Sequence, residues 1–224
     1  MALWVLDKDL SFPPVDTAQP DGLLAMGGDL SPERLLLAYR HGIFPWYEGE
    51  FILWWCPDPR FVLFPNELKI NRSTRSLLKK NKMETSEQQL EFSVNKSFNE
   101  VIHHCKKIMR PGQDGTWITD EMEAAYIRLH EMGYAHSAEV WKEGKLVGGV
   151  YGIRLGKVFF GESMFSKISN ASRVAFINYI KLLAEEGIEL IDCQVYTDYL
   201  ESFGARMISR KEFCTKLKFL ISHY

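Results

Sequence analysis

Residues 135–166 contain three short apolar runs separated by glycine turns, and this succession restricts the fold more than any other feature of the chain. The runs are HSAEVWKEG, KLVGGVYGIRLG and KVFFGESMFS, with turns predicted at positions 143–144 and 155–156. Apolar runs bounded by such turns are typical of consecutive antiparallel strands. A helical apolar period over 171–186 and a strand pattern over 189–195 follow. The chain is therefore predicted to have an α+β fold.

A short helix over 198–203 and a strand in GARMISR complete an order of three strands, helix, strand, helix and strand. This order resembles the acyl-transferring half of the N-acetyltransferase superfamily. In that superfamily, a glycine-rich loop before the central helix binds the pyrophosphate of coenzyme A. The corresponding loop here, FSKISNAS at 165–172, contains no glycine. The resemblance implies an acetyltransferase-like (GNAT-like) fold, and no coenzyme A or other cofactor is expected.

Two domains are expected, a small N-terminal α+β domain of residues 1–58 and an acetyltransferase-like catalytic domain of residues 59–224. The N-terminal part is rich in proline, glycine and tryptophan. Within it, Ser31 before Pro32 is typical of a helix N-cap followed by proline in the first turn, so a helix is predicted over 32–41. Further helices are predicted over 69–82, 98–109 and 120–132.

The composition is that of a globular protein, with 46% hydrophobic and 25% charged residues among 224. No apolar run approaches the roughly 18 residues that a membrane helix needs. The four cysteines are scattered, without the C-x-x-C spacing of a zinc site or a disulfide framework. We therefore expect a cytoplasmic protein, a monomer, with no metal and no membrane contact.

The net charge of −2 conceals a basic segment, LKINRSTRSLLKKNK, that contains no acidic residue. A solvated helix face and a contact with a nucleic-acid backbone both account for such a segment. Its cations are the candidate tRNA-binding residues, namely Lys69, Arg72, Arg75, Lys79, Lys80 and Lys82.

The stretch LIDCQV, residues 190–195, places a carboxylate and an amide inside an otherwise apolar strand pattern. Strand alternation predicts that Asp192 and Gln194 share one face and that Cys193 faces the other way. A buried carboxylate is costly unless it is hydrogen-bonded or used in chemistry. Asp192 and Gln194 are therefore the candidate catalytic pair, and acyl transfer through Cys193 is not expected.

Several stretches resemble the leucyl/phenylalanyl-tRNA–protein transferases. They are GLLAMGGDLSPERLLLAYRHGIFPW, LWWCPDPR, GTWIT, HSAEVW, LVGGVYG, FFGESMFS, NASRVA and LIDCQV. The resemblance implies transfer of leucine or phenylalanine from Leu-tRNA or Phe-tRNA to the α-amino group of proteins that begin with Arg or Lys, which marks them for degradation. Because aminoacyl-tRNA is already an activated ester, this reaction needs neither ATP nor a metal ion.

The resemblance also assigns roles to residues. Gln194 would accept a hydrogen bond from the attacking amine, as a positioning group or as a base, and Asp192 would polarise its amide. Trp46 would stack near the terminal adenosine of the tRNA. Independently of the resemblance, strand alternation places Glu162 with Phe160 and Met164, so its carboxylate is a candidate counter-ion of the acceptor's N-terminal Arg or Lys, with a salt bridge to a structural Arg as the alternative. The walls of the amino-acid pocket would be Val150, Phe159, Met164, Phe176 and Tyr179.

Two other classes of function remain open from the sequence. A coenzyme A-dependent N-acetyltransferase would share the fold but needs a pyrophosphate loop. A non-catalytic tRNA-binding protein would explain the basic segment and the tryptophans but gives Asp192 and Gln194 no role.

Overall fold

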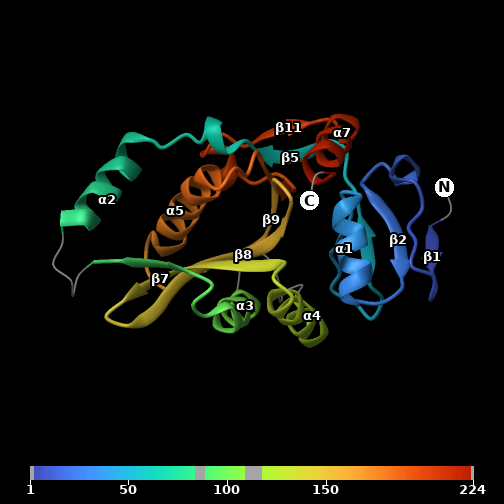
Figure 1. Ribbon diagram of the computed structural model, residues 1–224, viewed down its shortest axis with the longest axis horizontal. Helices are drawn as coiled ribbons and strands as arrows, with labels where there is room; N and C mark the ends of the chain where they lie inside the picture. The colour runs from blue at the N-terminus through green and yellow to red at the C-terminus, as the bar shows by residue number, and fades with distance from the viewer. Residues whose placement is uncertain (1–2, 84–88, 109–117, 223–224) are drawn as a thin grey trace.

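The computed structural model describes residues 3–83, 89–108 and 118–222 (Figure 1). Its N-terminal part holds a four-stranded sheet in the order β1-β2-β4-β3. The strands are Trp4–Leu6, Leu23–Gly27, Leu53–Trp55 and Phe44–Pro45 in that order, and β1 runs parallel to β2. Helix α1, Pro32–Arg40, begins as predicted, because the Ser31 hydroxyl accepts a hydrogen bond from the backbone N–H of Arg34.

The rest of the described chain forms a seven-stranded sheet in the order β11-β5-β10-β9-β8-β7-β6. The strands are β5 Arg60–Leu63, β6 Glu91–Val94, β7 Ala135–Lys142, β8 Lys145–Leu155, β9 Val158–Ser166, β10 Leu190–Gln194 and β11 Arg206–Ile208. In this sheet, β9 and β10 pair in parallel, whereas the other described neighbours pair antiparallel. A crossover helix, α5, Ala171–Glu185, connects the parallel pair.

Helices cover both faces of the large sheet, as Figure 1 shows. Helix α5 packs on one face, while α3, Phe98–Lys107, and α4, Asp120–Glu131, pack on the other. Helix α2, Arg72–Met83, lies at the end of the molecule away from the N-terminal sheet, and α6, Asp198–Glu201, follows β10. Two short 3₁₀ turns lie at Val15–Thr17 and Pro65–Glu67.

The predicted order of three strands, helix, strand, helix and strand is confirmed from β7 to β11. Both turns of the strand succession occur at or next to the predicted dipeptides, and Glu143 and Gly144 both adopt positive φ, as a tight hairpin turn requires. The sequence reading missed the last helix, α7, Arg210–Ile221. Its signal was present, since Ser209 caps the backbone N–H of Glu212 in an S-x-x-E pattern.

The two sheets share one continuous apolar core, which joins Tyr39 and Trp54 of the N-terminal part to Phe160 and Phe213 of the rest. The division at residues 58 and 59 therefore does not coincide with two separate cores, and it stays a prediction. Two other expectations fall on undescribed parts: residues 115–117 of GTWIT and the side chain of Lys82 lie outside the described residues. Among the described helices, none has the length and apolar character that crossing a membrane requires.

Candidate active site

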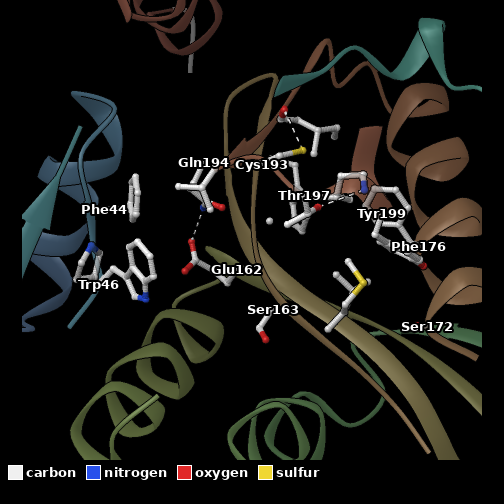
Figure 2. A pocket seen from close by; sticks show the side chains of 18 residues that line it. Phe44, Trp46, Glu162, Ser163, Ser172, Phe176, Cys193, Gln194, Thr197 and Tyr199 are labelled. Atoms are coloured by element: carbon white, nitrogen blue, oxygen red, sulfur yellow. Dashed lines mark hydrogen bonds between the residues drawn. The ribbon is translucent and has the colours of Figure 1, made fainter. Parts of the chain in front are cut away.

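A cavity of about 850 Å³ lies between the N-terminal part and the ends of β9 and β10 (Figure 2). Phe44 and Trp46 form one side, and Gln194 and Glu162 face them from the large sheet. The remaining wall is largely apolar and comes from β3, β8, β9, β10, α5 and the segment after β10. Its other lining residues are Pro45, Val150, Phe159, Gly161, Ser163, Met164, Ser172, Phe176, Ile191, Cys193, Val195, Thr197, Tyr199 and Leu200.

Two adjacent bulges shape the polar side of this cavity. In β9, Gly161 and Ser163 pair with consecutive residues of β8, so Glu162 is the extra residue. In β10, Asp192 and Gln194 pair with consecutive residues of β5, so Cys193 is the extra residue. A bulge re-aims the side chains at a strand end. The two strands pair only over 158–160 and 190–192, and beyond that point both carry their polar side chains into the cavity.

The bulge overturns one expectation from strand alternation. Cys193 was predicted to face away from Gln194, yet both residues line the cavity. The extra residue of the bulge interrupts the regular alternation of side chains between the two faces of the strand, so neighbouring side chains can lie on the same side. Cys193 remains a poor nucleophile for a different reason, since burial raises the pKa of its thiol and so disfavours the thiolate.

Gln194 sits in a left-handed backbone conformation with φ of 57°. Such a conformation costs a non-glycine residue about 1–3 kcal/mol, so the surrounding structure must hold it in place. Its side-chain Nε2 donates to Glu162 Oε1 at 3.3 Å, as Figure 2 shows. The amide orientation set by this bond leaves the Gln194 carbonyl oxygen as the acceptor for a substrate N–H.

Asp192 does not contact the side chain of Gln194, which corrects the expectation that it polarises that amide. Its carboxylate accepts two hydrogen bonds from Arg60, Nε at 2.8 Å and Nη2 at 2.6 Å, and a third from the backbone N–H of Gln194 at 3.0 Å. Asp192 is fully buried and does not line the cavity. It therefore acts on the site by fixing the bulged backbone that carries Gln194.

Arg60 is a site residue that the sequence reading missed. Its guanidinium is buried between the rings of Phe44 and Phe213, 4.7 and 4.6 Å from their centroids, and Phe44 is part of the cavity wall. Burial lowers the pKa of Arg60, but the charge and hydrogen bonds of Asp192, together with Cys56 and Cys214, raise it above its ordinary value, so the guanidinium stays charged. The signal was the Arg at the end of CPDPR, a charged residue at the start of an apolar strand pattern.

Glu162 is held by two tyrosines that the sequence reading also missed. Its Oε1 accepts from the Tyr39 hydroxyl at 2.7 Å, and its Oε2 accepts from the Tyr126 hydroxyl at 3.1 Å. Burial raises the pKa of Glu162 to about 7, although the hydrogen bonds from Tyr39 and Tyr126 lower it. No sequence spacing links these residues, because α1, α4 and β9 meet only in the folded chain.

Four of the five predicted wall residues of the amino-acid pocket line the cavity: Val150, Phe159, Met164 and Phe176. Tyr179 does not. It is buried behind Phe159, with ring centroids 5.1 Å apart in an edge-to-face arrangement. Its position one turn after Phe176 on α5 sets it deeper in the core, so it supports the wall and does not form it.

Trp46 lines the open side of the cavity and is 36% exposed. Its ring lies 5.7 Å from that of Trp55, whose Nε1 donates to the Trp46 carbonyl oxygen at 2.6 Å. This support holds an exposed indole face at the entrance, where a planar base can stack.

The basic segment is not brought to the cavity. The described side chains of Lys69, Arg72, Arg75, Lys79 and Lys80 are exposed on and before α2, across α5 from the N-terminal sheet. Arg75 donates from Nε to the backbone carbonyl of Ile70 at 2.8 Å, and α2 packs on the core through Leu77 and Leu78. The segment can therefore contact only a ligand that extends well beyond the cavity.

Comparison with known proteins identifies the family to which this arrangement belongs. Residues 62–218 match the family described as leucyl/phenylalanyl-tRNA protein transferase, and residues 28–58 match the N-terminal domain of the same family. The chain is 55% identical to the leucyl/phenylalanyl-tRNA–protein transferase of Flavobacterium johnsoniae, over 96% of this chain and 99% of that protein. It is also 55% identical to that of Stutzerimonas stutzeri, over 97% of this chain and 94% of that protein.

Among solved structures, the chain is similar to L-PGS from Bacillus licheniformis, with a TM-score of 0.44 and 12% identity over 90% of this chain and 74% of that one. The sequence matches are far closer, and they extend over both the N-terminal part and the sheet that carries Gln194 and Glu162. On that match, the chain belongs to the leucyl/phenylalanyl-tRNA–protein transferase family.

Proposed function

We propose that this protein transfers leucine or phenylalanine from aminoacyl-tRNA to the α-amino group of a protein that begins with Arg or Lys. The observation that carries the proposal is the single cavity that joins an apolar wall to a polar end. The wall suits a leucine or phenylalanine side chain, whereas Gln194 and Glu162 suit a cationic amine. The close relationship to proteins of this activity supports the same conclusion.

In this reaction the acceptor amine attacks the ester carbonyl, a C–N bond forms, and the C–O bond to the terminal ribose breaks. The ribose oxygen leaves with one proton that the nitrogen gives up. Gln194 would hold the amine in line by accepting one of its hydrogen bonds, since its own N–H groups are oriented by Glu162. Asp192 and Arg60 would act through the backbone, as positioning residues.

The two substrates would occupy opposite ends of the cavity. Trp46 would stack on the terminal adenosine, with the ester beyond it and the amino-acid side chain against Phe159 and Phe176. Glu162 would neutralise the cationic end of the acceptor. The division into domains at 58 and 59 and a monomeric state belong to the same proposal; the gap between the two family matches, residues 59–61, supports the division.

The decisive experiment is transfer of labelled leucine from Leu-tRNA to a peptide that begins with Arg, with the same peptide beginning with Glu as control. Product with the first peptide alone is expected. Binding of Leu-tRNA without any peptide product would favour the non-catalytic tRNA-binding alternative. Acetylation of the Arg peptide from acetyl-coenzyme A would instead favour the acetyltransferase alternative.

Enlarging the apolar wall should change the choice of amino acid. Phe159→Ala is expected to shift transfer away from leucine and toward phenylalanine and to lower turnover, because a loose side chain no longer fixes the ester for attack. Hydrophobic discrimination is about 1–3 kcal/mol per methylene, so a change of roughly tenfold in the leucine-to-phenylalanine ratio is expected. Competition between Leu-tRNA and Phe-tRNA measures it. Tyr179→Phe, behind the wall, should leave the ratio unchanged.

The basic segment should matter only for the body of the tRNA. Replacing Lys79 and Lys80 by Gln should raise KM for Leu-tRNA and flatten its dependence on salt, because fewer phosphate contacts release fewer counter-ions. The minimal substrate 3′-leucyl-adenosine should react as with the unchanged protein. Equal losses on both substrates would exclude a phosphate contact. Replacing Lys211 and Lys218 on α7 by Gln, which removes the same number of charges from exposed positions, is the control.

A further inference from the structure

Glu162, Tyr39 and Tyr126 form a closed set of short oxygen contacts at the polar end of the cavity. The Tyr39 and Tyr126 hydroxyl oxygens lie 2.5 Å apart, and each also contacts a different oxygen of Glu162. Both tyrosines are fully buried, so their hydroxyl groups have no bulk water to bond with. The set joins α1 of the N-terminal part to α4 and β9.

The number of protons in this set depends on the state of Glu162. With a carboxylate, two phenol protons must serve three oxygen–oxygen contacts, so one contact lacks a hydrogen bond. With a proton on Oε2, each contact has one: Glu162 donates to Tyr126, Tyr126 to Tyr39, and Tyr39 to Glu162 Oε1. The set can therefore take up a single proton without losing any of its three contacts.

The Glu162 carboxylate, which takes up this proton, is accessible to substrate. Unlike the two tyrosines, Glu162 lines the cavity, beside the Gln194 side chain that would hold the attacking amine. Gln194 donates a hydrogen bond to Oε1, but its amide cannot transfer a proton to the carboxylate. This hydrogen bond therefore orients the carboxylate without neutralising it.

We propose that Glu162 is the proton acceptor of the transfer reaction and that Tyr39 and Tyr126 are the positioning residues that hold its carboxylate. The proposal rests on the proposed function. The acceptor arrives as an α-ammonium group with three protons. One passes to Glu162, which frees the lone pair for attack, one passes to the leaving ribose oxygen, and one stays on the new amide. Glu162 then releases its proton to solvent.

The groups around Glu162 set the pH range in which it can do this. Tyr39 from α1 and Tyr126 from α4 lower its pKa by donating hydrogen bonds, as does the charge of Arg60 on β5, while Asp192 on β10 raises it. Burial is the largest effect, and the resulting pKa is about 7. An acceptor with this pKa is ionised in part at neutral pH and can exchange a proton with an α-ammonium group, whose pKa is about 7.7–8.0.

The pH dependence of kcat/KM for an Arg-beginning peptide tests the proposal, with 3′-leucyl-adenosine as donor and its uncatalysed hydrolysis subtracted. The unchanged protein should give a bell-shaped profile, rising as Glu162 ionises and falling as the α-ammonium group deprotonates. Glu162→Gln should be about 10²-fold slower at pH 7. Its rate should rise steadily through the α-amino pKa, since only the free amine then reacts.

Tyr126→Phe provides a second readout that does not require Glu162→Gln to fold. Loss of this hydrogen bond should raise the pKa of Glu162 and move the acidic limb to higher pH. The proposal would be overturned if the acidic limb of the pH profile stayed at the same pH in Tyr126→Phe. It would also be overturned if Glu162→Gln kept a bell-shaped profile with only a lower kcat/KM. Absence of leucyl transfer by the unchanged protein at every pH would contradict the proposed function instead.

Discussion

Asp192→Asn is expected to lower the free energy of unfolding by about 3–5 kcal/mol, the largest effect on stability that the site offers. The substitution keeps the shape of the side chain but leaves the Arg60 guanidinium buried without a carboxylate. Arg60 is 1% exposed and Asp192 0%, so water cannot replace the lost partner. Urea denaturation at neutral pH measures the difference.

A matched control shows whether burial is the cause. Glu189→Gln makes the same carboxylate-to-amide change in an exposed ion pair with Lys157, where the two side chains are 52% and 41% exposed. That variant should change the free energy of unfolding by less than about 1 kcal/mol. Equal effects of the two substitutions would show that the buried pair makes no special contribution.

Replacing both partners separates stability from activity. Arg60→Met with Asp192→Leu fills the space with apolar groups, and such replacements are often neutral or stabilising by about 1–4 kcal/mol. The double variant should therefore regain much of the stability lost in Asp192→Asn. It should not regain leucyl transfer, because the backbone N–H of Gln194 would still lack the carboxylate that fixes the bulge.

Gln194→Asn is expected to lower kcat for leucyl transfer by about 10²–10⁴-fold while the protein stays folded. Asparagine tolerates the left-handed backbone at this position better than glutamine does, so the melting temperature should be unchanged or slightly raised. Its amide is one methylene shorter, so it cannot keep both the bond to Glu162 and the reach to the amine. Transfer to an Arg-beginning peptide and binding of Leu-tRNA, measured together, give kcat and affinity.

Gln194→Glu is the complementary variant. Two carboxylates would then face each other across a contact that is 3.3 Å in the unchanged protein, and one of them would be forced to protonate. Activity should be low at neutral pH. Full activity of Gln194→Asn would show that the amide neither positions the amine nor accepts its hydrogen bond, whereas a gain by Gln194→Glu at high pH would show that Gln194 acts in place of a missing base.

Local patterns predicted much of the fold because their causes are local. A Ser-Pro pair begins α1, Thr119 caps α4, and glycine turns separate β7, β8 and β9; each depends on hydrogen bonds or backbone angles within a few residues. The family and its activity could also be predicted from the sequence, because the stretches that resemble the family are long and are spread along most of the chain.

Local sequence patterns thus predicted helix α1, the order of elements from β7 to β11, and the candidate pair Asp192 and Gln194, but not the strands of the N-terminal sheet or α7. The contacts of these residues depend on the packing of the folded chain. Because two bulges interrupt the strand alternation, the Asp192 carboxylate is hydrogen-bonded to Arg60, 132 positions away, and the Gln194 side chain is hydrogen-bonded to Glu162. The phenols of Tyr39 and Tyr126 meet at Glu162 from elements far apart in the chain. Contacts of this kind depend on packing between elements, and no periodicity within one segment encodes them.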